Sequence, residues 1–183
     1  MKPNLFQYAT SELSQDAILC WLLSWADNKH KGDDPVLHEF GRHFMNSIYE
    51  RTREKDLGNY QSIEIHQQDG GIDILCLINR NTALIIEDKV GSKQHSDQLT
   101  SYKEHVIQKG FPSDKILSVY LQTRDQSDYG EVLKHGYCVY ERRDLLKVLE
   151  SSSGRVGQRK RRVISSQTIP PTSGKSKTKS KVS

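Results

Sequence analysis

The stretch that decides the fold is Gly70–Lys89, with the sequence GGIDILCLINRNTALIIEDK. It holds two apolar runs of strand length, and a polar Asn-Arg-Asn segment at residues 79–81 separates them. Asparagine tolerates the left-handed backbone conformation that tight turns require, so we predict a β-hairpin with its loop at 79–81. In that register Ile78 pairs with Thr82, and the two apolar runs form antiparallel strands.

Three charged residues lie inside the apolar runs of this hairpin. Side chains along a strand alternate between its two faces, so Glu87 and Lys89 share a face. Counting back from the loop places Asp73 opposite Glu87. Charge among apolar residues is costly unless it is paired or holds a metal ion. The pattern predicts a functional site, although a structural ion network on a half-exposed sheet would have the same spacing.

The opposite face of the hairpin is apolar as well. Its residues are Ile72, Ile74, Cys76, Leu84, Ile86 and Val90. Strands that are apolar on both faces are normally covered on both sides. We therefore expect the three charges to lie in a cleft rather than on an open surface.

The spacing of these charges resembles the active-site motif of the PD-(D/E)XK nuclease superfamily. Asp73 is followed, after thirteen residues, by Glu-Asp-Lys at 87–89, and Ile72 stands where the name-giving motif has proline. Gln98 and Tyr102 match the Gln-x-x-x-Tyr motif of the RecB-like and Cas4-like branches. Including the opening segment from residue 8, which looks like the start of a bacterial family of the superfamily, the resemblance covers roughly residues 4–150.

The resemblance implies both a fold and an activity. The fold is an α/β, restriction-endonuclease-like αβββαβ core with a mixed central sheet flanked by helices. The activity is metal-dependent hydrolysis of DNA phosphodiester bonds, in a bacterial or phage setting such as phage defence or DNA repair. Two alternatives stay open: a catalytically inactive nuclease-fold module that binds nucleic acid or another partner, and an RNA-cleaving hydrolase.

The expected cofactor is Mg²⁺ or Mn²⁺, which prefers oxygen ligands. Asp73 and Glu87 supply carboxylates, and the backbone carbonyl of Asp88 can add a third oxygen. We expect the Asp88 side chain to point to the opposite face of the strand. Lys89 would orient the nucleophile and add positive charge as a compact point donor. In relatives an acid from an N-terminal helix often completes the metal site, and Glu12 is the matching residue here.

Further candidates lie outside the hairpin. Gln98 and Tyr102 are four residues apart and share a helix face, so both can position a phosphate or a metal-bound water. A Tyr102 packed in the core is the alternative. The candidate contacts to nucleic acid are Lys93 and the basic run Arg159, Lys160, Arg161 and Arg162.

Charge is distributed unevenly along the 183 residues. The chain has 27 basic and 23 acidic residues, a net charge of +4, but nine of the basic residues and no acid fall in 151–183. Residues 1–150 therefore carry more acid than base. The last segment is rich in Ser, Lys, Arg and Pro without an apolar face. We predict a nuclease-like domain at 1–150, with truncation at its end left open, and a basic disordered tail at 151–183.

The composition also bounds the surroundings of the protein. No apolar run is long enough to cross a membrane, and the N-terminus lacks the apolar segment of a secretory signal. Cys20, Cys76 and Cys138 lie far apart in apolar runs, which favours buried free thiols in a reducing cytoplasm. We expect a cytoplasmic protein whose partner is DNA, or RNA, and not a membrane.

Periodicity predicts the remaining elements. Apolar residues recur at helical spacing in four segments, two near the N-terminus, one that follows the motif strands and one that ends at residue 150. Apolar and polar residues alternate in three further segments, which predicts three more strands. The predicted helices are 14–27, from 33 onward, 93–109 and 142–150, and the predicted strands outside the hairpin are 62–66, 115–122 and 137–140. In the first helix we expect Ile18, Trp21, Leu22 and Trp25 to form the buried face.

Overall fold

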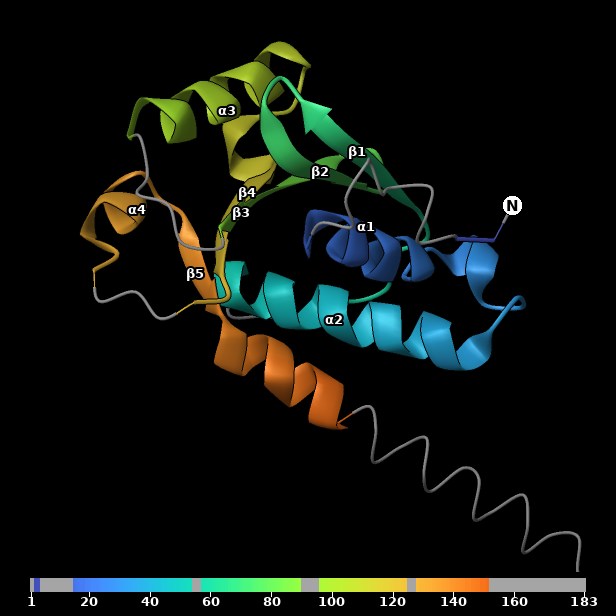
Figure 1. Ribbon diagram of the computed structural model, residues 1–183. Coiled ribbons are helices and arrows are strands. Elements are labelled where there is room, and N and C mark those ends of the chain that lie inside the picture. Colours follow the sequence, from blue (N-terminus) through green and yellow to red (C-terminus); the bar gives the residue numbers. More distant parts are fainter. Residues whose placement is uncertain (1, 4–14, 54–56, 90–95, 125–127, 152–183) are drawn as a thin grey trace, which may run out of the picture.

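The computed structural model describes residues 2–3, 15–53, 57–89, 96–124 and 128–151. Helices and strands alternate along the chain, as Figure 1 shows. In chain order the elements are α1 (Gln15–Trp25), α2 (Pro35–Arg53), β1 (Ile63–Asp69), β2 (Ile72–Ile78), β3 (Thr82–Lys89), α3 (Ser96–Gln108), β4 (Ile116–Gln122), α4 (Gly130–Lys134) and β5 (Cys138–Glu141). Residues 142–151 form a further helix.

The five strands form one mixed sheet in the order β1-β2-β3-β4-β5. β1, β2 and β3 pair antiparallel, whereas β3, β4 and β5 pair parallel. This arrangement confirms the predicted α/β class with its mixed central sheet. The short helix α4 was not predicted, because five residues are too few to show a helical period.

The β2–β3 hairpin has the predicted register. Ile78 pairs with Thr82, and the ladder continues to the pair Ile74 and Ile86. Asn79 and Arg80 adopt left-handed backbone angles, with φ of 50° and 57°. Two successive left-handed residues are typical of the turn type whose twist matches a hairpin. The Asn-Arg-Asn segment thus sets the register on which the placement of every charged residue depends.

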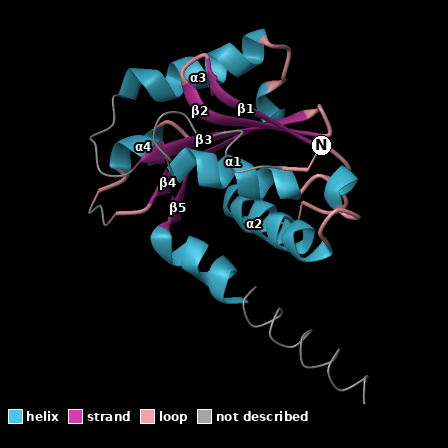
Figure 2. Ribbon diagram, turned by 45° about the vertical axis from the view of Figure 1, so that its right-hand side comes forward, coloured by secondary structure: helices cyan, strands magenta, loops and turns pink. Residues whose placement is uncertain are grey.

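Helices cover both faces of the sheet (Figures 1 and 2). On one face α1 and α2 pack against Ile74, Leu84 and Val119, in a core cluster that also includes Val148 from the last helix. On the other face α3 and α4 pack against a second cluster that includes Leu75 and Ile85. This burial confirms that an apolar hairpin is enclosed on both sides.

The two N-terminal helices follow the sequence pattern to different degrees. α2 begins as predicted, because Asp34 accepts hydrogen bonds from the backbone N–H groups of Val36 and Leu37 and so caps the helix. In α1 the prediction that Ile18 is buried was wrong, since 41% of it is exposed. Apolar residues occur on several sides of α1, and the side carrying Leu19 and Leu23 packs inward.

The cysteines are free thiols in the structure. Cys20 and Cys76 are buried as predicted, but Cys138 is only half-buried because it lies on the edge strand β5. In the part of the chain that the structure describes, no helix is both long and apolar enough to span a bilayer.

Candidate active site

The three predicted charged residues come together on the α3 side of the sheet. The Lys89 Nζ atom lies 2.6 Å from Oε1 of Glu87, and only 1% of the Glu87 side chain is exposed. The paired ladder of β2 and β3 ends at Ile74 and Ile86, so Asp73 and Glu87 are the next residues on the two strands. Oδ2 of Asp73 accepts a hydrogen bond of 2.9 Å from the backbone N–H of Asp88. Lys89 therefore pairs directly with Glu87, and the charge of Asp73 also acts on its ammonium.

Burial dominates the electrostatics of Glu87. The pKa of this carboxyl group is raised to about 7, chiefly by burial and also by the negative charge of Asp73, while the hydrogen bond from Lys89 opposes both effects. Within the described residues, Oε2 of Glu87 is buried and accepts no hydrogen bond. A carboxylate in this state is poorly compensated and favours a cation with more charge than a single ammonium.

Lys89 remains a cation in this environment. Burial lowers its pKa, but the hydrogen bond to Glu87 and the negative charges of Glu87 and Asp73 outweigh that effect, so the net shift is upward. The side chain keeps 20% of its surface exposed. Lys89 is thus both held by the site and reachable from solvent.

The side chain of Asp88 points to the other face of the sheet, as strand alternation predicts. It accepts a hydrogen bond from Nε2 of Gln15 on α1, whose Oε1 accepts one of 2.8 Å from Thr123. Burial raises the pKa of Asp88 to about 7. A strand residue directs its N–H and C=O to the same neighbour, so the carbonyl of Asp88, like its N–H, faces β2 and Asp73.

α3 brings Tyr102 beside the acids. Burial raises the pKa of Tyr102, and the charges of Glu87 and Asp73 raise it further, which places the phenol within reach of their field. The ring also lies over the start of β2, where a side chain at position 71 would come within 3.4 Å of it. Glycine at this position, with φ of 86°, leaves room for the ring.

The roles of the remaining predicted site residues stay predictions. Gln98 is exposed on α3, one turn before Tyr102, and its catalytic role stays a prediction. Other candidates lie outside the described residues, namely Glu12, Lys93, Arg159, Lys160, Arg161 and Arg162.

β4 adds polar residues that the sequence reasoning missed. In the parallel register Tyr120 pairs with Glu87, and Gln122 pairs with Lys89. Both side chains are buried, and within the described residues the Tyr120 hydroxyl and Oε1 of Gln122 have no hydrogen-bond partner. Burial, followed by the charge of Glu87, raises the pKa of Tyr120 to about 12. Polar residues at every second position of ILSVYLQ, 116–122, were the available signal.

The donor set fits a hard divalent cation. Asp73 and Glu87 provide carboxylate oxygens, and one oxygen of Glu87 is buried with no partner in the described part of the chain. The Asp88 carbonyl faces β2, as its N–H does. Mg²⁺ is commonly bound by one or two carboxylates and keeps several waters. The described residues contain no group of three or more His, Cys, Asp or Glu side chains arranged for a metal. Two carboxylates and one carbonyl leave coordination positions for the waters that Mg²⁺ keeps.

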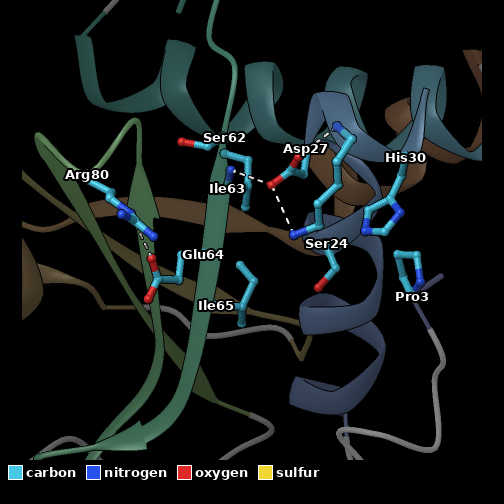
Figure 3. Close-up of a pocket in the computed structure, with 10 residues that line it drawn as sticks. Pro3, Ser24, Asp27, His30, Ser62, Ile63, Glu64, Ile65 and Arg80 are labelled. Carbon is cyan, nitrogen blue, oxygen red and sulfur yellow. Dashed lines mark hydrogen bonds and ion pairs between the residues drawn. The ribbon is translucent and has the colours of Figure 1, made fainter. Parts of the chain in front are cut away.

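A separate pocket of about 690 Å³ lies between the end of α1 and β1 (Figure 3). Buried Asp27 lines it and accepts hydrogen bonds from the backbone N–H groups of Ile63, at 3.0 Å, and Lys29, at 2.8 Å. These bonds join the end of α1 to the start of the edge strand. The lining contains neither the acids nor the lysine of the β2–β3 cluster, so the pocket is separate from that cluster.

Comparison with known proteins agrees with this geometry. The family model of the PD-(D/E)XK nuclease superfamily matches residues 3–168 of the chain. The match covers most of the chain and extends past residue 150. No curated protein and no solved structure was found to match. The mixed five-stranded sheet flanked by helices is the restriction-endonuclease-like arrangement that the sequence resemblance implies. The chain belongs to the PD-(D/E)XK nuclease superfamily.

Proposed function

We propose that the protein is a divalent-metal-dependent nuclease that hydrolyses DNA phosphodiester bonds at Asp73, Glu87 and Lys89. The observation that carries this proposal is the state of Glu87. Its carboxyl group is almost fully buried next to a second acid, one of its oxygens has no hydrogen-bond partner among the described residues, and its pKa is raised to about 7. A chain has little structural reason to bury charge in this way, whereas a metal site requires it.

Asp73, Glu87 and the Asp88 carbonyl are the groups that would hold Mg²⁺ or Mn²⁺. When bound, such an ion supplies Lewis-acid stabilisation of developing phosphate charge and lowers the pKa of a coordinated water. The protein's own part is to hold the two carboxylates side by side. The hairpin register does this, and the Asp88 N–H fixes the orientation of Asp73.

Lys89 contributes positive charge where the phosphate would lie. Its ammonium has three N–H donors, and Oε1 of Glu87 engages one. The remaining donors can hydrogen-bond a non-bridging phosphate oxygen or the attacking water. Such contacts gain strength as negative charge develops in the transition state. Tyr102 lies close enough to Glu87 and Asp73 for their charges to raise its pKa. Its hydroxyl can orient the substrate, together with Gln98 one helical turn away.

Contact with the nucleic-acid backbone is proposed for Lys93 and for the basic run at 159–162. The domain at 1–150 has more acidic than basic residues, so phosphate contacts must come from local basic groups. In this proposal the basic segment at 151–183 contributes non-specific affinity that falls with added salt.

The test is incubation with end-labelled single- and double-stranded DNA and RNA, and with circular plasmid, in Mg²⁺, Mn²⁺ or chelator. Glu87→Gln, purified in parallel, controls for contaminating nucleases. We expect DNA cleavage that needs the divalent ion and is absent in the variant. Cleavage of RNA alone would reassign the substrate, and binding without any cleavage would favour the inactive module.

A further inference from the structure

Gln122 is a buried polar residue for which the proposed roles of Asp73, Glu87 and Lys89 leave no explanation. It is the last residue of β4 and pairs with Lys89 of β3 in the parallel register, so the two side chains leave the sheet on the same face. Only 2% of Gln122 is exposed. Within the described residues, its Oε1 is buried and accepts no hydrogen bond.

An amide oxygen buried without a donor is unfavourable, and native proteins rarely retain one without a reason. The neighbouring strand supplies a group that could satisfy it. The Lys89 ammonium carries three N–H donors, but in this structure it is held 2.6 Å from Oε1 of Glu87. Among the described residues Lys89 therefore forms an ion pair with Glu87, and Gln122 lies opposite it on β4 as a second possible acceptor.

A divalent ion bound at Glu87 would change this arrangement. The ion and the ammonium are both cations attracted to the same carboxylate, so binding of the ion would weaken the ion pair between Lys89 and Glu87. The long, flexible lysine side chain can rotate toward β4, where Oε1 of Gln122 accepts an N–H. The ammonium then stays in the site instead of turning to solvent.

We propose that Gln122 is a positioning residue that accepts a hydrogen bond from Lys89 when the Glu87 carboxylate binds a divalent ion. The inference rests on the proposed function in one respect only, namely that Glu87 binds such an ion. It assigns Gln122 a role through Lys89, and neither direct contact with the metal nor a purely structural part.

The test is a double-mutant cycle on metal affinity, with Mn²⁺ alone as the probe and calorimetry as the readout. The four proteins are the unmodified chain, Gln122→Met, Lys89→Met and the double variant. Gln122→Met should weaken Mn²⁺ binding about tenfold when Lys89 is present, the scale of one hydrogen bond to a charged group. It should have no effect in the Lys89→Met background, because the displaced ammonium no longer exists.

Two controls separate this role from packing. Ser118→Ala removes another buried oxygen from the same face of β4, but Ser118 pairs with Ile85, so this variant should leave Mn²⁺ affinity unchanged. Gln122→Ala removes the acceptor as Gln122→Met does but packs differently, so a loss common to both variants is due to the acceptor. Thermal melts in chelator verify that each variant is folded.

Equal losses in both Lys89 backgrounds would overturn the inference, as would no loss in either. The outcome is independent of turnover. Coupled Mn²⁺ binding in a protein that cleaves no nucleic acid would support the role of Gln122 and contradict the proposed nuclease activity. Cleavage without coupling would do the reverse.

Discussion

Nζ of Lys89 lies 2.6 Å from Oε1 of Glu87, and the carboxylate of Asp73 is close enough to Glu87 to raise its pKa. When Asp73 and Glu87 are both ionised, their two negative charges and the positive charge of Lys89 give the cluster a net charge of −1. The excess negative charge is concentrated at Glu87, whose second oxygen is buried and accepts no hydrogen bond within the described residues.

Glu87→Gln should abolish cleavage while leaving the protein as stable as before, or more stable, in chelator. The amide keeps an acceptor for Lys89 and removes the buried charge. Activity on labelled DNA and the urea midpoint are the two measurements, and Asp73→Asn should behave similarly. Unfolding of both variants would instead show that the charges form a structural ion network.

The stability of the protein in chelator should fall as the pH rises from about 4.5 to about 7. The folded-state pKa of Glu87, about 7, lies above its ordinary value of 4.5, so the folded protein binds more protons in this window. Raising the pH deprotonates Glu87 in the folded protein, which lowers the free energy of unfolding by at most about 3 kcal/mol for this group. Urea titrations at several pH values measure the slope.

Asp88 complicates the pH slope, because its pKa is also raised to about 7 and has the same sign. Glu87→Gln and Asp88→Asn should each remove part of the slope, and the double variant most of it. A stability that rises between pH 5 and 8 and is unaffected by either substitution would contradict the assignment.

Lys89→Ala should lower turnover by about 10²–10³-fold without weakening the binding of divalent ions. The lysine stabilises charge that develops in the transition state, and in the resting protein it competes with a cation for Glu87. Lys89→Arg should also have low turnover, since a planar guanidinium cannot occupy the place of a compact ammonium. Single-turnover kinetics and Mn²⁺ calorimetry separate the two effects.

The hairpin part of this site could be predicted because its determinants are local. The loop at 79–81 sets the register, and alternation then assigns Asp73, Glu87 and Lys89 to one face and Asp88 to the other. No information from distant segments is needed for that step. Membership of the superfamily extends the same motif to a nuclease fold.

The contribution of β4 could not be predicted in the same way. Tyr120 and Gln122 lie beside Glu87 and Lys89 only because β4 pairs parallel with β3 after a helical crossover, and the register of such a pair depends on packing rather than on a turn. Similarly, Ile18 looked like a core residue because α1 is apolar on several sides, and packing against the neighbouring elements decides which side is buried.

Asp69→Asn should loosen α3 from the sheet. The carboxylate of Asp69, at the end of β1, lies 2.8 Å from Nε2 of His105 and 2.6 Å from Nζ of Lys109, both on or just after α3. Its hydrogen bond with Lys109 lowers its pKa, so its contribution is present above the ordinary pKa of 3.8 and is lost as the pH falls through the folded value. We expect a loss of about 1 kcal/mol at pH 7, measured by urea unfolding.

Loosening α3 should also reduce turnover, since this helix carries Tyr102. Lys109→Met is the matched control, because it removes one partner of Asp69 and leaves His105 in place; a smaller effect is expected. Gly70→Ala should be at least as harmful as Asp69→Asn, since its Cβ would lie 2.6 Å from the His105 ring at a φ of 65°. Unchanged stability in all three variants would contradict the proposal that Asp69 anchors α3 to the sheet.

Asp88→Asn should retain both activity and stability, although this residue lies between Glu87 and Lys89. Its side chain accepts from Gln15 on the α1 side, and asparagine keeps an oxygen for that bond while removing a buried charge. The groups of residue 88 that face the site, its N–H to Asp73 and its carbonyl, belong to the backbone and do not change. Asp88→Ala should cost about 1–2 kcal/mol, because the Gln15 amide loses its acceptor, yet the folded protein should still cleave. Cleavage rates and urea midpoints of both variants decide the matter. An inactive Asp88→Asn protein beside an active Lys89→Ala protein would mean that the faces of β3 are assigned the wrong way round, since no backbone group differs between aspartate and asparagine.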